Sequence, residues 1–108
     1  MATGKIAGKK QTAASIASGF TAPKNVIQKE GHIVCLNIEV SGNIGVSNYT
    51  TVATLPEGFI PPATIVKAYE PVRGSSAYLR ISHLNGNIDI FPANTAITSA
   101  YVVETFMV

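Results

Sequence analysis

The stretch Thr54–Pro62 reads TLPEGFIPP, and the predicted fold depends on it. Leu55 precedes a proline, which holds its backbone in the β or polyproline region, and Gly58 supplies a position that is free to turn. The apolar residues Phe59 and Ile60 follow where the chain reverses, and the two prolines after them prevent a helix from starting there. The stretch therefore predicts a rigid, apolar corner between two strands.

Short runs of β-forming residues lie on both sides of this corner, separated by turn residues about every dozen positions, which predicts an all-β sandwich or barrel. Further strands are expected at Asn25–Gln28, His32–Val40, Ile44–Thr54, Thr64–Tyr69 and Ala100–Val108, with turns at Lys29–His32 and Ser41–Asn43. Alternation within His32–Val40 predicts one buried face, made of Val34, Leu36, Ile38 and Val40. The closing strand is expected to be inserted in a sheet, because its end is apolar.

Asn85-Gly86 gives the clearest local signal, because this dipeptide suits the two positive-φ positions of a type I′ hairpin. Taking these two residues as the centre of the turn predicts that Leu84 faces Asn87 and that Arg80 faces Phe91. One face of the hairpin is then core, formed by Leu79, Ile81, Ile88 and Ile90. The outer face carries Tyr78, Arg80, Ser82, Asp89 and Phe91.

Residues 1–22 differ in composition from the rest, being mostly Ala, Gly, Ser, Thr and Lys. This composition predicts an N-terminal arm or neck linker, with a short helix over Thr12–Ser18 as an alternative. Ile16 and Phe20 stand four residues apart and would pack on a neighbour if the arm is ordered. Residues 23–108 are then expected to form one β-sandwich domain.

The composition excludes several classes of function. The 108 residues suffice for one core, and only 13% of them are charged. The net charge is +2, but residues 25–108 hold four basic against six acidic side chains, a net charge of −2. Nucleic-acid binding is not expected, because it requires clustered Lys and Arg on the folded surface. We expect no membrane association either, since no apolar run approaches the length of a membrane span and the start does not resemble a secretory signal.

Catalytic groups are scarce, with two histidines, one cysteine and one aspartate. There is no Gly-x-Ser-x-Gly elbow, no Walker spacing and no visible pairing of carboxylates. Cys35 is the single cysteine, so we exclude an intrachain disulfide and a cysteine-based zinc site and expect a buried, inert thiol. We therefore predict a protein that is not an enzyme and has no catalytic residues, metal or cofactor.

Binding remains as the expected activity, and tyrosines are its best candidates because they stack on sugar rings or fill protein interfaces. Beside Tyr78, the outer face of the hairpin places Arg80 and Asp89 on diagonal neighbours, a pair that suits hydroxyl-rich ligands. The alternative is an exposed cross-strand ion pair with no ligand, while Phe91 favours partial coverage of this face by a subunit contact. The residues predicted to bind ligand are Tyr69, Tyr78, Arg80, His83 and Asp89, although His83 also reads as a solvent-edge residue.

The order of these elements resembles the C-terminal head domain of receptor-binding or baseplate proteins from the tail tips of phages that infect Gram-positive bacteria. The resemblance covers residues 25–108 and rests on the pattern NVIQKEGHIVCLNIEVSG, then ATLPEGFIPP, then AYLRISHLNGNIDIF and a closing strand. The corner over Leu55–Pro61 is its most specific part, and Lys29–Val34 and Leu79–Ile90 match the hairpins. IAGKK, at Ile6–Lys10, resembles a short motif in the necks of some such proteins.

This resemblance implies a compact antiparallel β-sandwich or jelly-roll-like head, assembled as a homotrimer at the virion tail tip after synthesis in the host cytoplasm. It implies binding of host cell-wall polysaccharide or teichoic acid, and contacts with other phage tail proteins through the N-terminal arm. No family motif transfers the saccharide site, and the chain lacks the Trp of several sugar-binding relatives. A structural or assembly module of the baseplate that binds no saccharide is the alternative.

Overall fold

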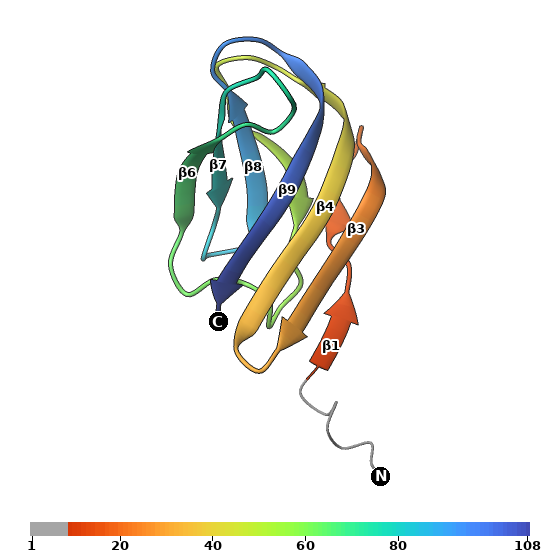
Figure 1. Ribbon diagram of the computed structural model, residues 1–108, viewed down its shortest axis with the longest axis vertical. Coiled ribbons are helices and arrows are strands. Elements are labelled where there is room, and N and C mark those ends of the chain that lie inside the picture. The colour runs from red at the N-terminus through yellow and green to blue at the C-terminus, as the bar shows by residue number, and fades with distance from the viewer. Residues whose placement is uncertain (1–8) are drawn as a thin grey trace.

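The computed structural model describes residues 9–108, which form nine strands (Figure 1). The strands are β1 (Lys9–Thr12), β2 (Ser15–Ile16), β3 (Thr21–Glu30), β4 (Ile33–Ile44), β5 (Thr50–Thr54), β6 (Ile65–Tyr69), β7 (Ala77–Ile81), β8 (Asn87–Pro92) and β9 (Ile97–Met107). Within these residues, no helix has the length and apolar character needed to cross a membrane.

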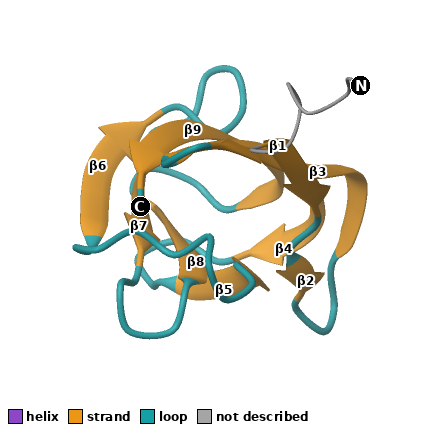
Figure 2. Cartoon of the chain, turned by 90° about the horizontal axis from the view of Figure 1, so that it is seen from below, coloured by secondary structure: helices purple, strands orange, loops and turns teal. Residues whose placement is uncertain are grey.

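The strands form two antiparallel sheets that pack face to face as a sandwich (Figure 2). The four-stranded sheet has the order β1-β3-β4-β9, and the five-stranded sheet has the order β2-β5-β8-β7-β6. Every described pairing of neighbouring strands is antiparallel. The prediction of an all-β antiparallel sandwich is therefore confirmed.

The core lies between the sheets and is built from alternate residues of the long strands. The predicted inward face of β4 is confirmed, because Val34, Leu36, Ile38 and Val40 are buried. The predicted inward face of the β7–β8 hairpin is also confirmed, and its members Leu79, Ile81, Ile88 and Ile90 are buried as well. Each sheet thus has one buried and one outer face.

The predicted apolar corner connects β5 to β6 and contacts the tip of the β7–β8 hairpin. Leu55 is buried, and its N–H donates to the carbonyl oxygen of Gly86 at 2.9 Å. Phe59 and Ile60 are partly buried and pack against the core. A Cβ at Gly86 would lie 2.9 Å from Ile60 Cγ1, so the hairpin tip approaches the corner too closely for a larger residue.

The predicted register of the β7–β8 hairpin is wrong, although its faces are right. Arg80 pairs with Asp89 instead of Phe91, and Tyr78 pairs with Phe91. The turn has four residues, 83–86, because the Ser82 N–H donates to the Asn87 carbonyl at 3.0 Å. The register moves by two residues relative to the prediction, and an even shift keeps every side chain on its face.

Side-chain contacts explain why the turn is wider than a type I′ turn. A type I′ turn needs positive φ at both central residues, but only Gly86 has it here, with φ of 77°. The Asn85 side chain instead accepts the Asn87 N–H at 3.0 Å, and Ser82 Oγ accepts the Leu84 N–H at 3.1 Å. These local bonds stabilise the four-residue loop.

The N-terminal segment joins the sandwich earlier than the expected boundary at residue 22. β1 pairs with β3 and β2 pairs with β5, so residues 9–22 contribute to both sheets. The Asn25 side chain donates to the Ala14 carbonyl at 2.9 Å and accepts the Ala14 N–H at 2.8 Å. These pairings use the backbone groups that a helix over Thr12–Ser18 would need, and no such helix forms. The Ile6–Lys10 motif lies mostly outside the described residues.

Two local expectations for β4 are wrong. The expected turn at Ser41–Asn43 is an irregularity inside β4, where the register with β9 shifts between Ser41 and Ile44. Gly42 has φ of 155°, and a Cβ there would lie 2.5 Å from a Phe20 ring carbon. Cys35 is exposed instead of buried, because the alternation that buries its neighbours directs it to the outer face.

The closing strand β9 belongs to the four-stranded sheet, as expected, and lies at its edge, where β4 is its one partner among the described strands. Its apolar end is nevertheless anchored. Phe106 and Val108 pack against the core, and the Val108 N–H donates to the His32 carbonyl at 2.8 Å. At the other edge of β9, the Tyr101 N–H donates to the Pro71 carbonyl at 2.9 Å, so the loop after β6 covers part of that edge.

Candidate ligand-binding face

The outer face of the five-stranded sheet carries two neighbouring hollows. One hollow on this face has a volume of about 410 Å³ and is called here the polar hollow. It is lined by Thr51, Thr64, Arg80, Ser82, Asn85, Asn87 and Asp89. A second, apolar hollow of about 360 Å³ is called the aromatic shelf and is lined by Tyr49, Val66, Tyr78 and Phe91. Arg80 links the two, because it lines the first and contacts Tyr49 of the second.

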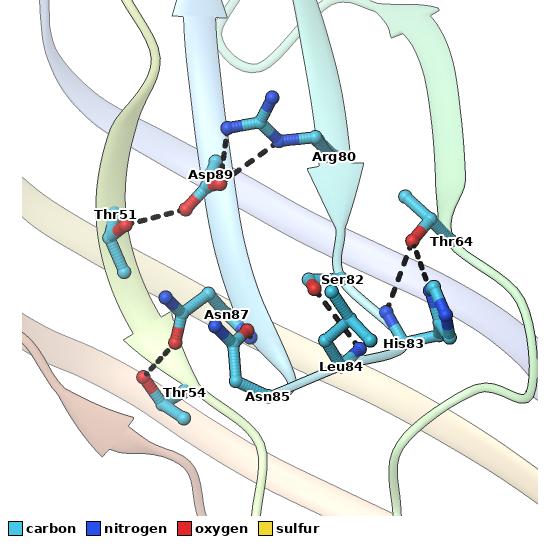
Figure 3. Close-up of polar contacts among 10 residues, drawn as sticks. All are labelled: Thr51, Thr54, Thr64, Arg80, Ser82, His83, Leu84, Asn85, Asn87 and Asp89. Atoms are coloured by element: carbon cyan, nitrogen blue, oxygen red, sulfur yellow. Dashed lines mark hydrogen bonds and ion pairs between the residues drawn. The ribbon is translucent and has the colours of Figure 1, made fainter.

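An ion pair forms part of the lining of the polar hollow (Figure 3). Arg80 donates from Nε and Nη2 to Asp89 Oδ2 at 3.1 and 2.9 Å. Thr51 Oγ1 donates to the other carboxylate oxygen at 2.6 Å. The Asp89 side chain is only 8% exposed, while that of Arg80 is 40% exposed. Asp89 therefore holds Arg80 in place, and Arg80 is the member of the pair that faces solvent.

The Tyr49 ring stacks on the Arg80 guanidinium and belongs to a cluster of three aromatic rings. Arg80 Cζ lies 3.8 Å from the centre of the Tyr49 ring, within the range of a cation–π contact. The Phe91 ring lies between two tyrosines, with its centre 5.1 Å from that of Tyr49 and 6.0 Å from that of Tyr78. Both distances are typical of favourable aromatic pairs, so the shelf is a packed surface.

Hydrogen bonds also fix the amide side chains below the ion pair. Thr54 Oγ1 donates to Asn87 Oδ1 at 3.0 Å (Figure 3). Asn85 Oδ1 accepts the Asn87 N–H at 3.0 Å. Both side chains thus use their carbonyl oxygens within the protein. Among the described residues, no hydrogen bond uses their amide nitrogens, so two donors remain at the hollow.

The structure brings three of the five predicted site residues together, since Tyr78, Arg80 and Asp89 lie on the same face. His83 belongs to the hairpin loop beside the polar hollow, where its Nδ1 lies 2.7 Å from Thr64 Oγ1 (Figure 3). Tyr69 does not join the cluster. It packs against the core, and burial together with the nearby Glu104 carboxylate raises the pKa of its hydroxyl far above the usual value.

Sequence reasoning missed the residues that β5 and its preceding loop contribute. Tyr49 and Thr51 reach the site because β5 pairs with β8, which places Thr51 opposite Asp89. That pairing joins strands far apart in the chain, and no local signal announces it. Asn85 is predicted only as a turn residue, and Asn87 only as the start of the following strand. Asn85 in the four-residue loop and Asn87 at the start of β8 both line the hollow.

The chemistry of this face suits binding. The polar groups that line the hollow are one guanidinium, one carboxylate, three hydroxyls and two amides, and the hollow lies next to an aromatic surface. In residues 9–108, no three His, Cys, Asp or Glu side chains come together as metal ligands would. Hydroxyl, amide and aromatic groups side by side are what a sugar ring requires, because its faces are apolar and its edges are polar.

Comparisons with known proteins support the fold. No family model matches the sequence, and no curated protein sequence does. The two-sheet sandwich nevertheless has the fold of a phage receptor-binding protein. One matching structure is the receptor binding protein (gp15) of Listeria phage PSA, at a TM-score of 0.54 and 20% sequence identity. The match covers 93% of this chain and 66% of that protein, which confirms at the level of fold the resemblance to tail proteins of phages of Gram-positive bacteria.

Proposed function

We propose that this chain is the head of a phage tail receptor-binding protein that attaches the virion to a saccharide of the host cell wall. Its binding site is the outer face of the five-stranded sheet, with Tyr78 and Arg80 as contact residues and Asp89 as the residue that positions Arg80. His83 lies at the rim. Attachment of this kind is non-covalent and leaves the saccharide chemically unchanged.

The observation that carries the proposal is the polar hollow beside the aromatic shelf, joined by Arg80. Two hydrogen bonds to Asp89 Oδ2 and stacking on Tyr49 hold the guanidinium in one place before any ligand arrives. Groups held in advance lose less conformational entropy on binding, which favours affinity. The fold of the phage protein adds support, since that relative is itself described as a receptor binding protein.

The test is sedimentation of the purified protein with cell walls from a panel of Gram-positive bacteria that includes Listeria. We expect retention on walls of some strains and no retention on others. Failure to bind any wall in the panel would leave only a structural role in the tail. Single sites of micromolar affinity are sufficient for retention on the wall, because several linked copies bound to one surface dissociate far less readily than one copy.

We also propose that the head is a homotrimer, with copies meeting on the outer face of the four-stranded sheet. An exposed apolar strip lies there, in which Ile33, Val103 and Met107 are 48, 64 and 65% exposed. Ile33 and Met107 are direct cross-strand partners, and Val103 lies on the same face of β9, opposite Asn37 of β4. Contact with other tail proteins through the N-terminal residues stays a prediction, and residues 1–8 lie outside the described part of the chain.

A further inference from the structure

We infer that the polar hollow selects an uncharged sugar, so that the receptor is a neutral wall polysaccharide and not the polyol phosphate chain of teichoic acid. This inference rests on the proposed function and adds the class of ligand. The sugar lies with its hydroxyls toward the polar hollow, whose residues Figure 3 shows. An apolar side of the sugar, either a C–H face or a methyl substituent, rests on the aromatic shelf.

The first argument for an uncharged ligand is the charge balance of the hollow. Of the seven lining residues, only Arg80 and Asp89 are charged, and they neutralise each other at 2.9 Å. A phosphate drawn toward Arg80 would also approach the Asp89 carboxylate, and like charges at that range repel. Phosphate sites usually gather several cationic groups, whereas this hollow has a net charge of zero.

The hydrogen-bonding groups of the hollow carry the second step. Arg80 Nη1 and the amide nitrogens of Asn85 and Asn87 form none of the hydrogen bonds found among the described residues, so they are available as donors. The Thr51 hydroxyl donates to Asp89, so its oxygen is available as an acceptor, and the Ser82 hydroxyl, whose oxygen accepts the Leu84 N–H, is available as a donor. Sugar hydroxyls donate and accept at once, and a surface that mixes donors with acceptors matches them.

The aromatic shelf carries the third step. Tyr78 is 45% and Tyr49 37% exposed, and Phe91 between them is partly covered. This surface is apolar and adjoins the hollow at Arg80. A pyranose that rests an apolar side on the shelf removes that surface from water, while a phosphodiester chain has no comparable group to place there.

The first experiment uses the unmodified protein and a wall that it binds. Two competitors are prepared from that wall: neutral oligosaccharides freed of anionic fragments by ion exchange, and purified teichoic acid. We expect the neutral fraction to compete and the teichoic acid not to, with a wall affinity that changes less than about twofold between 0.05 and 0.5 M NaCl. Competition by teichoic acid, with loss of affinity in high salt, would overturn the inference and leave the proposed function standing. Absence of wall binding would overturn both.

The second experiment compares two substitutions that each remove one negative charge. Asp89→Asn acts inside the hollow, and Glu104→Gln acts at the other ion pair, where Lys67 lies 3.3 Å away. We expect Asp89→Asn to weaken binding of the neutral fraction at least tenfold and to introduce salt-sensitive binding of teichoic acid, because Arg80 then has no counter-charge. Glu104→Gln should leave both ligands within twofold of the wild type. Equal effects of the two variants would mean that overall charge decides binding, which contradicts the inference. The salt series on the unmodified protein does not depend on how either variant folds.

Discussion

Single residues decide whether the hairpin tip fits the corner, and Gly86 is the clearest case. Its φ is 77°, a region that L side chains rarely adopt, and an added Cβ would meet Ile60 Cγ1 at 2.9 Å and the Leu55 carbonyl oxygen at 3.0 Å. We predict that Gly86→Ala lowers the free energy of unfolding by about 2–4 kcal/mol, measured by chemical denaturation.

Gly74→Ala is the matched control for this prediction. Gly74 also has positive φ, 84°, but an added Cβ there would meet nothing within 4 Å. Gly74→Ala should lower the free energy of unfolding by about 1 kcal/mol, the cost of positive φ for a residue with a Cβ. An equal decrease in the free energy of unfolding of the two variants would contradict a close steric contact between the corner and the hairpin tip.

Tyr69 supplies a prediction on pH dependence. Burial, and then the charge of Glu104, raises the pKa of its hydroxyl in the folded state above the ordinary value of 10.0. Below pH 10 the hydroxyl is protonated in both states and adds no pH dependence. As the pH rises above 10, the unfolded chain loses the proton first, so the free energy of unfolding falls, by at most about 1.4 kcal/mol per pH unit.

Chemical denaturation between pH 8 and 11 measures whether the free energy of unfolding falls above pH 10 as predicted. Tyr69→Phe should lose stability less steeply than the wild type above pH 10, whereas Tyr101→Phe, at an exposed tyrosine, should follow the wild type. A Tyr69→Phe curve parallel to that of the wild type would contradict the raised pKa.

For single residues, the sequence predicts which side of its strand a side chain lies on better than it predicts which residues that side chain contacts. Strict alternation in β4 and in the β7–β8 hairpin was enough to identify the buried residues, since period two is a local property. The same alternation, followed consistently, also places Cys35 outside, and the expectation of a buried thiol came from composition. Tyr69 was grouped with the site for its chemistry, although its contacts are with the core.

Strands differ in how many partners hold them, which predicts an order of stability within the sandwich. β4 pairs along its length with β3 and β9, and β8 pairs with β5 and β7. β2 has two residues and pairs with β5 alone. We predict the slowest amide hydrogen exchange in β4 and β8 and the fastest in β1 and β2. Exchange in β2 as slow as in β4 would contradict this order.

At the scale of the element, long-range pairing is what the sequence does not reveal. The corner and the hairpin were predictable because proline, glycine and Asn-Gly act on their neighbours. The pairing of β5 with β8, which completes the site with Tyr49 and Thr51, joins segments about 38 residues apart, as the Thr51–Asp89 bond shows. The pairing of β1 with β3 likewise turned part of a polar segment into sheet, because a free edge accepts any extended backbone.

The whole molecule is expected to assemble through the apolar strip of Ile33, Val103 and Met107. We predict a solution mass of three chains by light scattering. Val103→Glu should weaken association at least tenfold, because it introduces a charge into an apolar contact. Val46→Glu, at a loop residue that is 41% exposed, is the control and should keep the mass of the wild type. A wild-type mass of one chain at every concentration would contradict the assembly.

The central claim is that the outer face of the five-stranded sheet binds the host wall, and one comparison of two tyrosines tests it most directly. Tyr78 lies on that face and Tyr101 on the outer face of the other sheet, and they are 45 and 49% exposed. The affinity for a cell wall that the wild type binds is measured by sedimentation. We expect Tyr78→Ala to bind at least tenfold more weakly than the wild type and Tyr101→Ala to bind within twofold of it, with both variants keeping the solution mass of the wild type. Equal retention of the two variants, or selective loss by Tyr101→Ala, would contradict the claim.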